Sequence, residues 1–124
     1  MVGDAVKDDT TRHFLEAMNE VEVILSSDSF VKRSITEKGL ACWVEFANES
    51  VLVEFSFGPP EWHVNMIIRV SNMKYEFKDL LKIPVVNEWV RKNRHKQRDL
   101  SNIRDELMWF VELMKISLRE IETN

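Results

Sequence analysis

Several features that often reveal the class of a protein are scarce in this chain. Cys42 is the only cysteine, so the sequence excludes an internal disulfide framework and a cysteine-based zinc cluster. Three glycines and three prolines argue against collagen-like repeats and disordered linkers. No apolar run approaches the roughly 18 residues of a membrane-spanning helix. The first 25 residues carry acids throughout and lack the apolar core of a secretory signal, so we expect a cytoplasmic protein with no membrane contact.

What is present fits one globular domain. The chain has 124 residues, of which 44% are hydrophobic and 31% are charged, as is usual for a single domain. We expect this domain to span residues 1–124, with residues 1–9 as a flexible tail. Apolar residues recur every three or four positions from Thr10 to Ser26, which predicts an amphipathic helix. They are Phe14, Met18, Val21 and Leu25. No motif requires a cofactor, and none is expected.

From residue 30 to residue 77 apolar and polar residues alternate, as in strands that bury one face. Tight turns are expected at Asn48-Glu49 and Asn72-Met73, with a four-residue loop at 58–61. The turns predict three cross-strand pairs that keep the apolar side chains on one face. These pairs are Phe46 with Val51, Phe55 with Val64, and Val70 with Tyr75. Residues 30–36 can add an edge strand in which Arg33 points inward.

Two helices are predicted after the sheet. Pro84 suits the first turn of a helix in which Val86, Trp89 and Val90 share one side. A longer helix over 101–122 has a stripe of apolar residues. The stripe consists of Ile103, Leu107, Phe110, Met114, Leu118 and Ile121. The fold class is therefore α+β: an N-terminal helix, an antiparallel meander sheet of four or five strands, and two C-terminal helices packed on one face of the sheet.

The second face of the predicted sheet is less polar than a solvated face should be. The expected register places Glu54 between Trp43 and Asn65, and it places Glu45 opposite Leu52. Apolar anchors inside a polar rim are typical of an interface. The residues expected to contact a partner are Trp43, Glu45, Glu54, Asn65, Trp62 and His63. The competing interpretation is that the first helix or a second copy covers this face, so that its residues are core.

His63 supports an alternative from another class. In this alternative the chain is a small enzyme or ligand-binding domain that uses His63, Glu54 and Arg69. Ser56 is the only nucleophile expected near His63, and no glycine-rich elbow or oxyanion-hole signature surrounds it. The three histidines fall in separate elements, so we expect no metal site. An enzyme is therefore the less favoured class.

The strongest local charge lies in residues 91–98, where RKNRHKQR holds five Lys or Arg. Such a cluster suits a phosphate backbone. However, the whole chain has a net charge of −4, and Trp89 falls on the apolar side of its helix, whereas nucleic-acid binders usually expose stacking aromatics. Nucleic-acid binding through 91–98 therefore stays a further alternative that we do not expect.

Composition and pattern together favour a non-enzymatic protein-binding module. Seven of the first 28 residues are acidic and only two are basic. One fitting class is the small acidic immunity protein that neutralises a toxin, because an acidic surface steers a basic toxin toward it. We therefore expect a protein partner such as a basic toxin. The sequence leaves the identity of the partner and the oligomeric state open.

Overall fold

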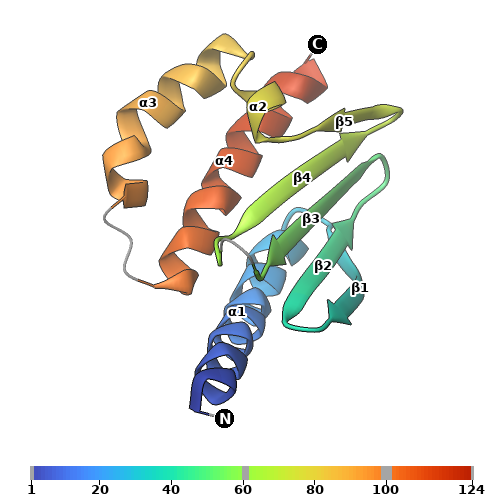
Figure 1. The fold of residues 1–124 in the computed structure, drawn as a ribbon. Helices are drawn as coiled ribbons and strands as arrows, with labels where there is room; N and C mark the ends of the chain where they lie inside the picture. The colour runs from blue at the N-terminus through green and yellow to red at the C-terminus, as the bar shows by residue number, and fades with distance from the viewer. Residues whose placement is uncertain (1, 60–61, 99–101, 124) are drawn as a thin grey trace.

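The computed structural model describes residues 2–59, 62–98 and 102–123, and Figure 1 shows their arrangement. The helices are α1 (Val2–Ser26), α2 (Phe77–Leu80), α3 (Pro84–Arg98) and α4 (Ile103–Thr123). The strands are β1 (Val31–Lys38), β2 (Ala41–Ala47), β3 (Val51–Phe57), β4 (Asn65–Val70) and β5 (Met73–Tyr75). The predicted α+β fold, with an N-terminal helix, an antiparallel meander and C-terminal helices, is confirmed. The short helix α2 was not predicted.

The sheet has one helical side and one bare side. Its strands pair in chain order from β1 to β5 and are antiparallel throughout. Helices α1 and α4 pack against each other and against the sheet, while α3 packs on α4 (Figure 1). No helix in the described ranges covers the opposite face. That face is therefore the broadest surface on which sheet residues meet solvent.

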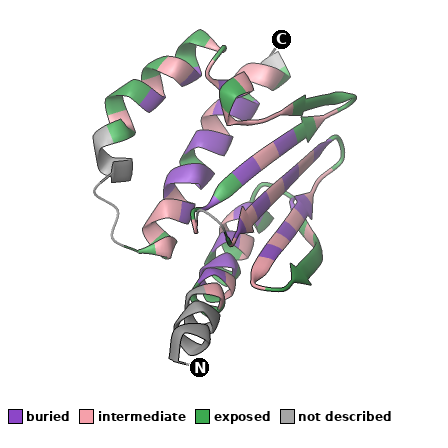
Figure 2. Ribbon diagram, in the orientation of Figure 1, coloured by how far each residue is buried: buried purple, intermediate pink, exposed green. Residues whose placement is uncertain are grey.

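The core lies between the sheet and the two long helices. Burial alternates along β2, β3 and β4, as Figure 2 shows by the change of colour along each strand. The inward side chains are fully or almost fully buried. They include Cys42, Val44, Phe46, Val53, Phe55, Met66 and Ile68. The helices meet them with Phe14 and Val21 of α1 and with Leu107, Leu113 and Met114 of α4. The buried residues form one contiguous cluster, as expected of one domain.

Helix α1 is longer than its periodicity indicates. It begins at Val2, so the predicted start at Thr10 is wrong, whereas the flexibility of residues 1–9 stays a prediction. The helix ends where Ser26 and Ser27 donate hydroxyl hydrogen bonds to the carbonyls of Val23 and Ile24. Ser29 then takes a positive φ of 68°, which turns the chain into β1.

The predicted faces of the strands are right, but each predicted hairpin register is wrong by two residues. In β2 and β3, Phe46 lies opposite Val53 rather than Val51. The cause is the side chain of Asn48, whose Oδ1 accepts hydrogen bonds from the backbone N–H groups of Ser50 and Val51. Asn48 thus closes the turn from its first position, and Glu49-Ser50 forms the tip. A shift of two residues preserves the faces because side chains alternate with a period of two.

The β3–β4 register also shifts by two residues toward the C-terminus, whereas the β4–β5 register shifts by two residues toward the N-terminus. Phe55 lies opposite Met66, because the β3–β4 loop is longer than four residues and is closed by a hydrogen bond from the N–H of Trp62 to the carbonyl of Gly58. In the β4–β5 hairpin Ser71 takes a φ of 56° and Val70 pairs with Met73 rather than Tyr75.

Two consequences of the predicted pair Val70 with Tyr75 also fail. That pair would place Arg69 opposite Glu76, but Arg69 lies opposite Lys74. Phe77 starts α2 rather than extending a strand, because Glu76 and Asp79 form a reciprocal capping box.

The edge strand β1 differs from the prediction in both its bounds and its inward residue. It runs from Val31 to Lys38 instead of 30–36. Its register with β2 shifts between Lys32 and Ser34, so Arg33 is an extra, bulged residue. Arg33 is exposed rather than inward, and Lys32 forms an ion pair at 3.0 Å with Glu22 of α1. The bulge therefore spares the core an unpaired charge.

Candidate protein-binding face

Alternate residues of the sheet point away from the helices and form what we call the outer sheet face. Its members are Trp43, Glu45, Leu52, Glu54, Ser56, Asn65, Ile67, Arg69 and Lys74. Asn65, Arg69 and Lys74 are exposed, and the others are half-buried. These half-buried residues gain their partial cover from neighbours in the sheet. The predicted second face is thus present and uncovered in the single chain.

Two pairs of like charges lie on this face. Glu45 is directly opposite Glu54, and Arg69 is directly opposite Lys74. Like charges placed opposite each other on neighbouring strands destabilise a sheet. Within the described part of the chain neither Glu45 nor Glu54 has a salt bridge or hydrogen bond, and the same holds for Arg69. Lys74 has one loose ion pair, from Nζ to Oε1 of Glu76 at 3.8 Å.

Apolar side chains flank both charge pairs. Leu52 lies opposite Arg69, and Ile67 lies opposite Glu54. Trp43 lies opposite Ser56, which in turn lies opposite Asn65. The face therefore combines half-buried apolar side chains with two pairs of like charges.

Four of the six predicted partner residues share the outer sheet face, and two do not. Trp43, Glu45, Glu54 and Asn65 are on it, although their cross-strand neighbours differ from the prediction. Trp62 instead anchors the β3–β4 loop, with its ring centroid 5.7 Å from that of Phe57.

His63 lies outside the strand ladder beside α4. Its Nδ1 is 3.6 Å from Oε2 of Glu106, and its side chain is largely exposed. Arg69 lies near the opposite end of β4. The structure thus separates His63 from Glu54 and Arg69, so the three residues of the enzyme alternative form no common site. Among the described residues there is also no group of three or more potential metal ligands.

Glu106 was missed as a contact residue because its signal in the sequence is only that of an acid in the first turn of a helix. One oxygen, Oε1, accepts a hydrogen bond from the backbone N–H of Val64, and the other faces His63. Glu106 is partly buried and links α4 to the start of β4. Its role is to position the loop that carries Trp62 and His63.

The basic segment 91–98 lies in α3 and is exposed at Arg91, Lys92 and Arg94, while the side chains of residues 95–98 lie outside the described ones. Lys92 pairs with Glu88 at 2.9 Å, and this hydrogen-bonded cation lowers the pKa of Glu88. Trp89 packs on Trp109 with ring centroids 5.2 Å apart. Trp89 is therefore engaged with α4 and does not provide a free platform for a nucleobase.

Cys42 has the environment of a core residue. It is fully buried between β2 and the helices. Burial, with a smaller effect of Glu37, raises the pKa of its thiol from 9.0 to about 11. The thiolate needed for nucleophilic attack is thus disfavoured, and Cys42 acts as a core side chain.

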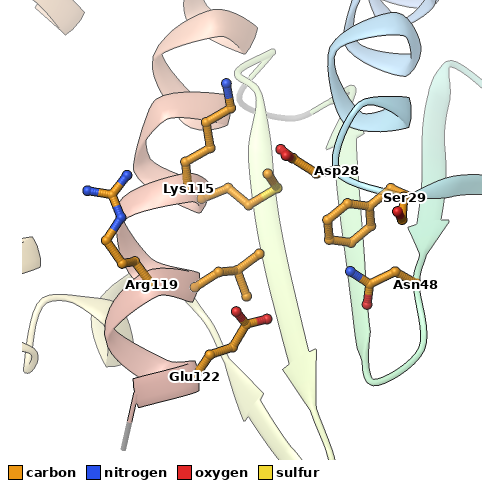
Figure 3. Close-up of a pocket in the computed structure, with 9 residues that line it drawn as sticks. Asp28, Ser29, Asn48, Lys115, Arg119 and Glu122 are labelled. Atoms are coloured by element: carbon orange, nitrogen blue, oxygen red, sulfur yellow. The ribbon is translucent and has the colours of Figure 1, made fainter.

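One cleft lies away from the outer sheet face, between the C-terminal half of α4 and the turns that follow α1 and β2 (Figure 3). Its volume is about 540 Å³. Asp28 and Glu122 contribute acids, and Lys115 and Arg119 contribute bases. None of the predicted site residues lines this cleft.

Comparisons with known proteins do not add a family or a function. No family model, no curated protein and no solved structure matches the chain. Of the helices in the described ranges, none has both the length and the apolar composition that crossing a bilayer requires.

Proposed function

We propose that this protein is a non-enzymatic protein-binding module that contacts its partner through Trp43, Glu45, Glu54 and Asn65. The observation that carries the proposal is that Glu45 and Glu54 face each other without a cation from the described residues. A basic side chain of a partner placed between them would turn a repulsive pair into a charge-assisted contact. Trp43 would supply the apolar anchor at the centre of such a contact.

The class of partner that fits best is a protein with a basic surface, and the proposed role is that of a small acidic immunity protein that neutralises a toxin. The net charge of −4 supports steered association with a cationic partner. We place the interaction in the cytoplasm, where a lone buried cysteine such as Cys42 stays a thiol. His63 and Trp62 are left out of the contact because they lie at the β3–β4 loop.

The partner is sought by photo-crosslinking from the face itself. A photoreactive benzoylphenylalanine replaces Ser56, beside Trp43 on the outer sheet face, and a control protein carries it at the exposed Glu112 of α4. Both proteins are irradiated in extracts of the source cells, and the adducts are identified by mass spectrometry. We expect one partner protein that is captured from position 56 and not from position 112. Capture of no protein other than further copies of the chain would contradict the proposal.

The captured partner is then produced and its binding kinetics are measured. Trp43→Ala should raise the dissociation rate at least about tenfold, because a central aromatic anchor is lost. Glu45→Gln combined with Glu54→Gln should lower the association rate and its dependence on salt. Glu112→Gln serves as the matched control and should change neither rate. Unchanged kinetics in both face variants would remove the face from consideration.

A further inference from the structure

Four residues at the centre of the outer sheet face form a regular patch. Leu52 lies directly opposite Arg69, and two residues further along the same strands Glu54 lies directly opposite Ile67. Neighbouring strands are about 4.8 Å apart, and residues i and i+2 are about 6.7 Å apart along a strand. Leu52 and Ile67 therefore occupy one diagonal of the patch, and Arg69 and Glu54 occupy the other.

We propose that a second copy of this chain occupies the outer sheet face, related to the first by a two-fold axis along the Leu52–Ile67 diagonal. Turning one copy over about this diagonal brings Leu52 onto Leu52 of the second copy and Ile67 onto Ile67. The same operation exchanges the other two corners, so Arg69 of each copy faces Glu54 of the other. Such an isologous contact closes on itself and makes a dimer.

Two further charged residues, Lys74 and Glu45, also pair across the proposed two-fold axis. Lys74 lies beyond Arg69 on β5, and Glu45 lies beyond Glu54 on β2, so the two lie on opposite sides of the axis. The rotation therefore also brings Lys74 of each copy toward Glu45 of the other. Each like-charge pair that is unfavourable within its own chain meets the pair of opposite sign in the second copy. A uniformly basic surface covering the whole face would instead set cations against Arg69 and Lys74.

The size of the face sets the strength of this contact. The five strands hold 31 residues, and with strands about 4.8 Å apart and a rise of about 3.3 Å per residue they give a face of about 500 Å² per copy. Two copies bury about 1,000 Å² together, near the lower limit for a specific interface, so the dimer is weak and reversible. The proposed dimer and the proposed partner contact use the same face, and this is the only point on which the dimer rests on the proposed function. The dimer then covers Glu45 and Glu54 until a partner displaces the second copy.

The test is the mass of the full-length protein by sedimentation and light scattering, from about 10 µM to about 1 mM and at low and high salt. One variant reverses the acids (Glu45→Lys with Glu54→Lys), and a second reverses the bases (Arg69→Glu with Lys74→Glu). We expect the mass of the wild type to rise toward twice the monomer mass as the concentration increases. At high salt we expect the dimer to be weaker, because salt screens the charge pairs. Each variant alone should dimerise at least about tenfold more weakly. An equimolar mixture of the two should regain the dimer, because their faces are then fully opposite in charge.

The mixture also controls for folding, since two misfolded variants would not restore a defined dimer. Reversal of two exposed or half-buried charges on α4, Glu112→Lys with Lys115→Glu, should leave the dimer unchanged. A wild type that remains monomeric at the highest concentration would overturn the inference and leave the proposed partner contact standing. A dimer that survives both face variants would also overturn it, because the copies would then meet elsewhere. Crosslinks from position 56 only to a second copy would support this inference while contradicting the proposed function.

Discussion

Gly58 lies against Ala41 so closely that a β-carbon on Gly58 would be 2.6 Å from the Cα of Ala41 and 2.8 Å from its Cβ. The two residues meet because Gly58 follows Phe57, which pairs with Cys42 at the end of the β2–β3 ladder. Gly58 also has a φ of 149°, a backbone conformation that residues other than glycine rarely adopt. The β3–β4 loop can therefore leave the sheet at this point only with glycine.

The first prediction is that Gly58→Ala lowers the free energy of unfolding by about 2 to 4 kcal/mol, since it combines overpacking against backbone with an unfavourable φ. Gly39→Ala is the matched control. Gly39 also has a positive φ, of 62°, but a β-carbon there would meet no atom within 4 Å. Its cost should be only about 1 to 2 kcal/mol. Urea denaturation of the two variants measures the difference, and equal losses would show that the contact with Ala41 is not restrictive.

The second prediction concerns the link between Glu106 and Val64. Glu106→Ala removes the acceptor of the Val64 N–H and should cost about 1 to 3 kcal/mol, because a partly buried donor is left unsatisfied. Glu106→Gln keeps an acceptor oxygen and should recover most of that loss. Hydrogen exchange of the Val64 amide reports the bond directly. Fast exchange in the alanine variant with slow exchange in the glutamine variant is the expected result, and similar rates in the two would contradict the assigned role.

The order of the elements and the faces of the strands could be predicted because both depend on periodicity, which is written along the chain. Phe46 and Phe55 point inward in both the predicted and the observed register, since a shift of two residues leaves each side chain on the same face of the sheet. The register could not be predicted in the same way. It depends on side chains that bond to the backbone of turns, such as Asn48, and on residues that accept a positive φ, such as Ser71 and Trp62.

The same limit explains the outcome for the candidate site. Trp43, Glu45, Glu54 and Asn65 were placed on one face by parity alone. Whether Glu45 lies opposite Glu54 depends on the register of β2 and β3, so the sequence did not predict this pair. Trp62 and His63 lie in the β3–β4 loop, where Trp62 bonds to Gly58 and His63 faces the distant Glu106. No local pattern reports a contact so far apart in the sequence.

The third prediction tests how α4 packs. Phe110 is buried, and its ring centroid is 6.4 Å from that of Phe77 and 5.2 Å from that of Trp109. Phe110→Ala should therefore cost about 3 to 5 kcal/mol. The exposed Glu112→Ala on the same helix should change stability by less than about 0.5 kcal/mol. A loss below about 1 kcal/mol for Phe110→Ala, measured by chemical denaturation, would show that this side chain is not in the core.

The fourth prediction follows from the buried thiol of Cys42. In the folded chain the thiol of Cys42 has a pKa of about 11, whereas in the unfolded chain it has the ordinary pKa of 9.0. Between these values the folded state binds more protons, so the contribution of Cys42 is fully present below about pH 9 and is lost as the pH rises toward 11. Cys42→Ala removes this contribution and leaves every other ionisable side chain in place. The free energy of unfolding of the wild type should therefore fall more steeply than that of Cys42→Ala across this range. Parallel pH profiles of the two proteins would show that the thiol ionises as readily in the folded chain as in the unfolded one.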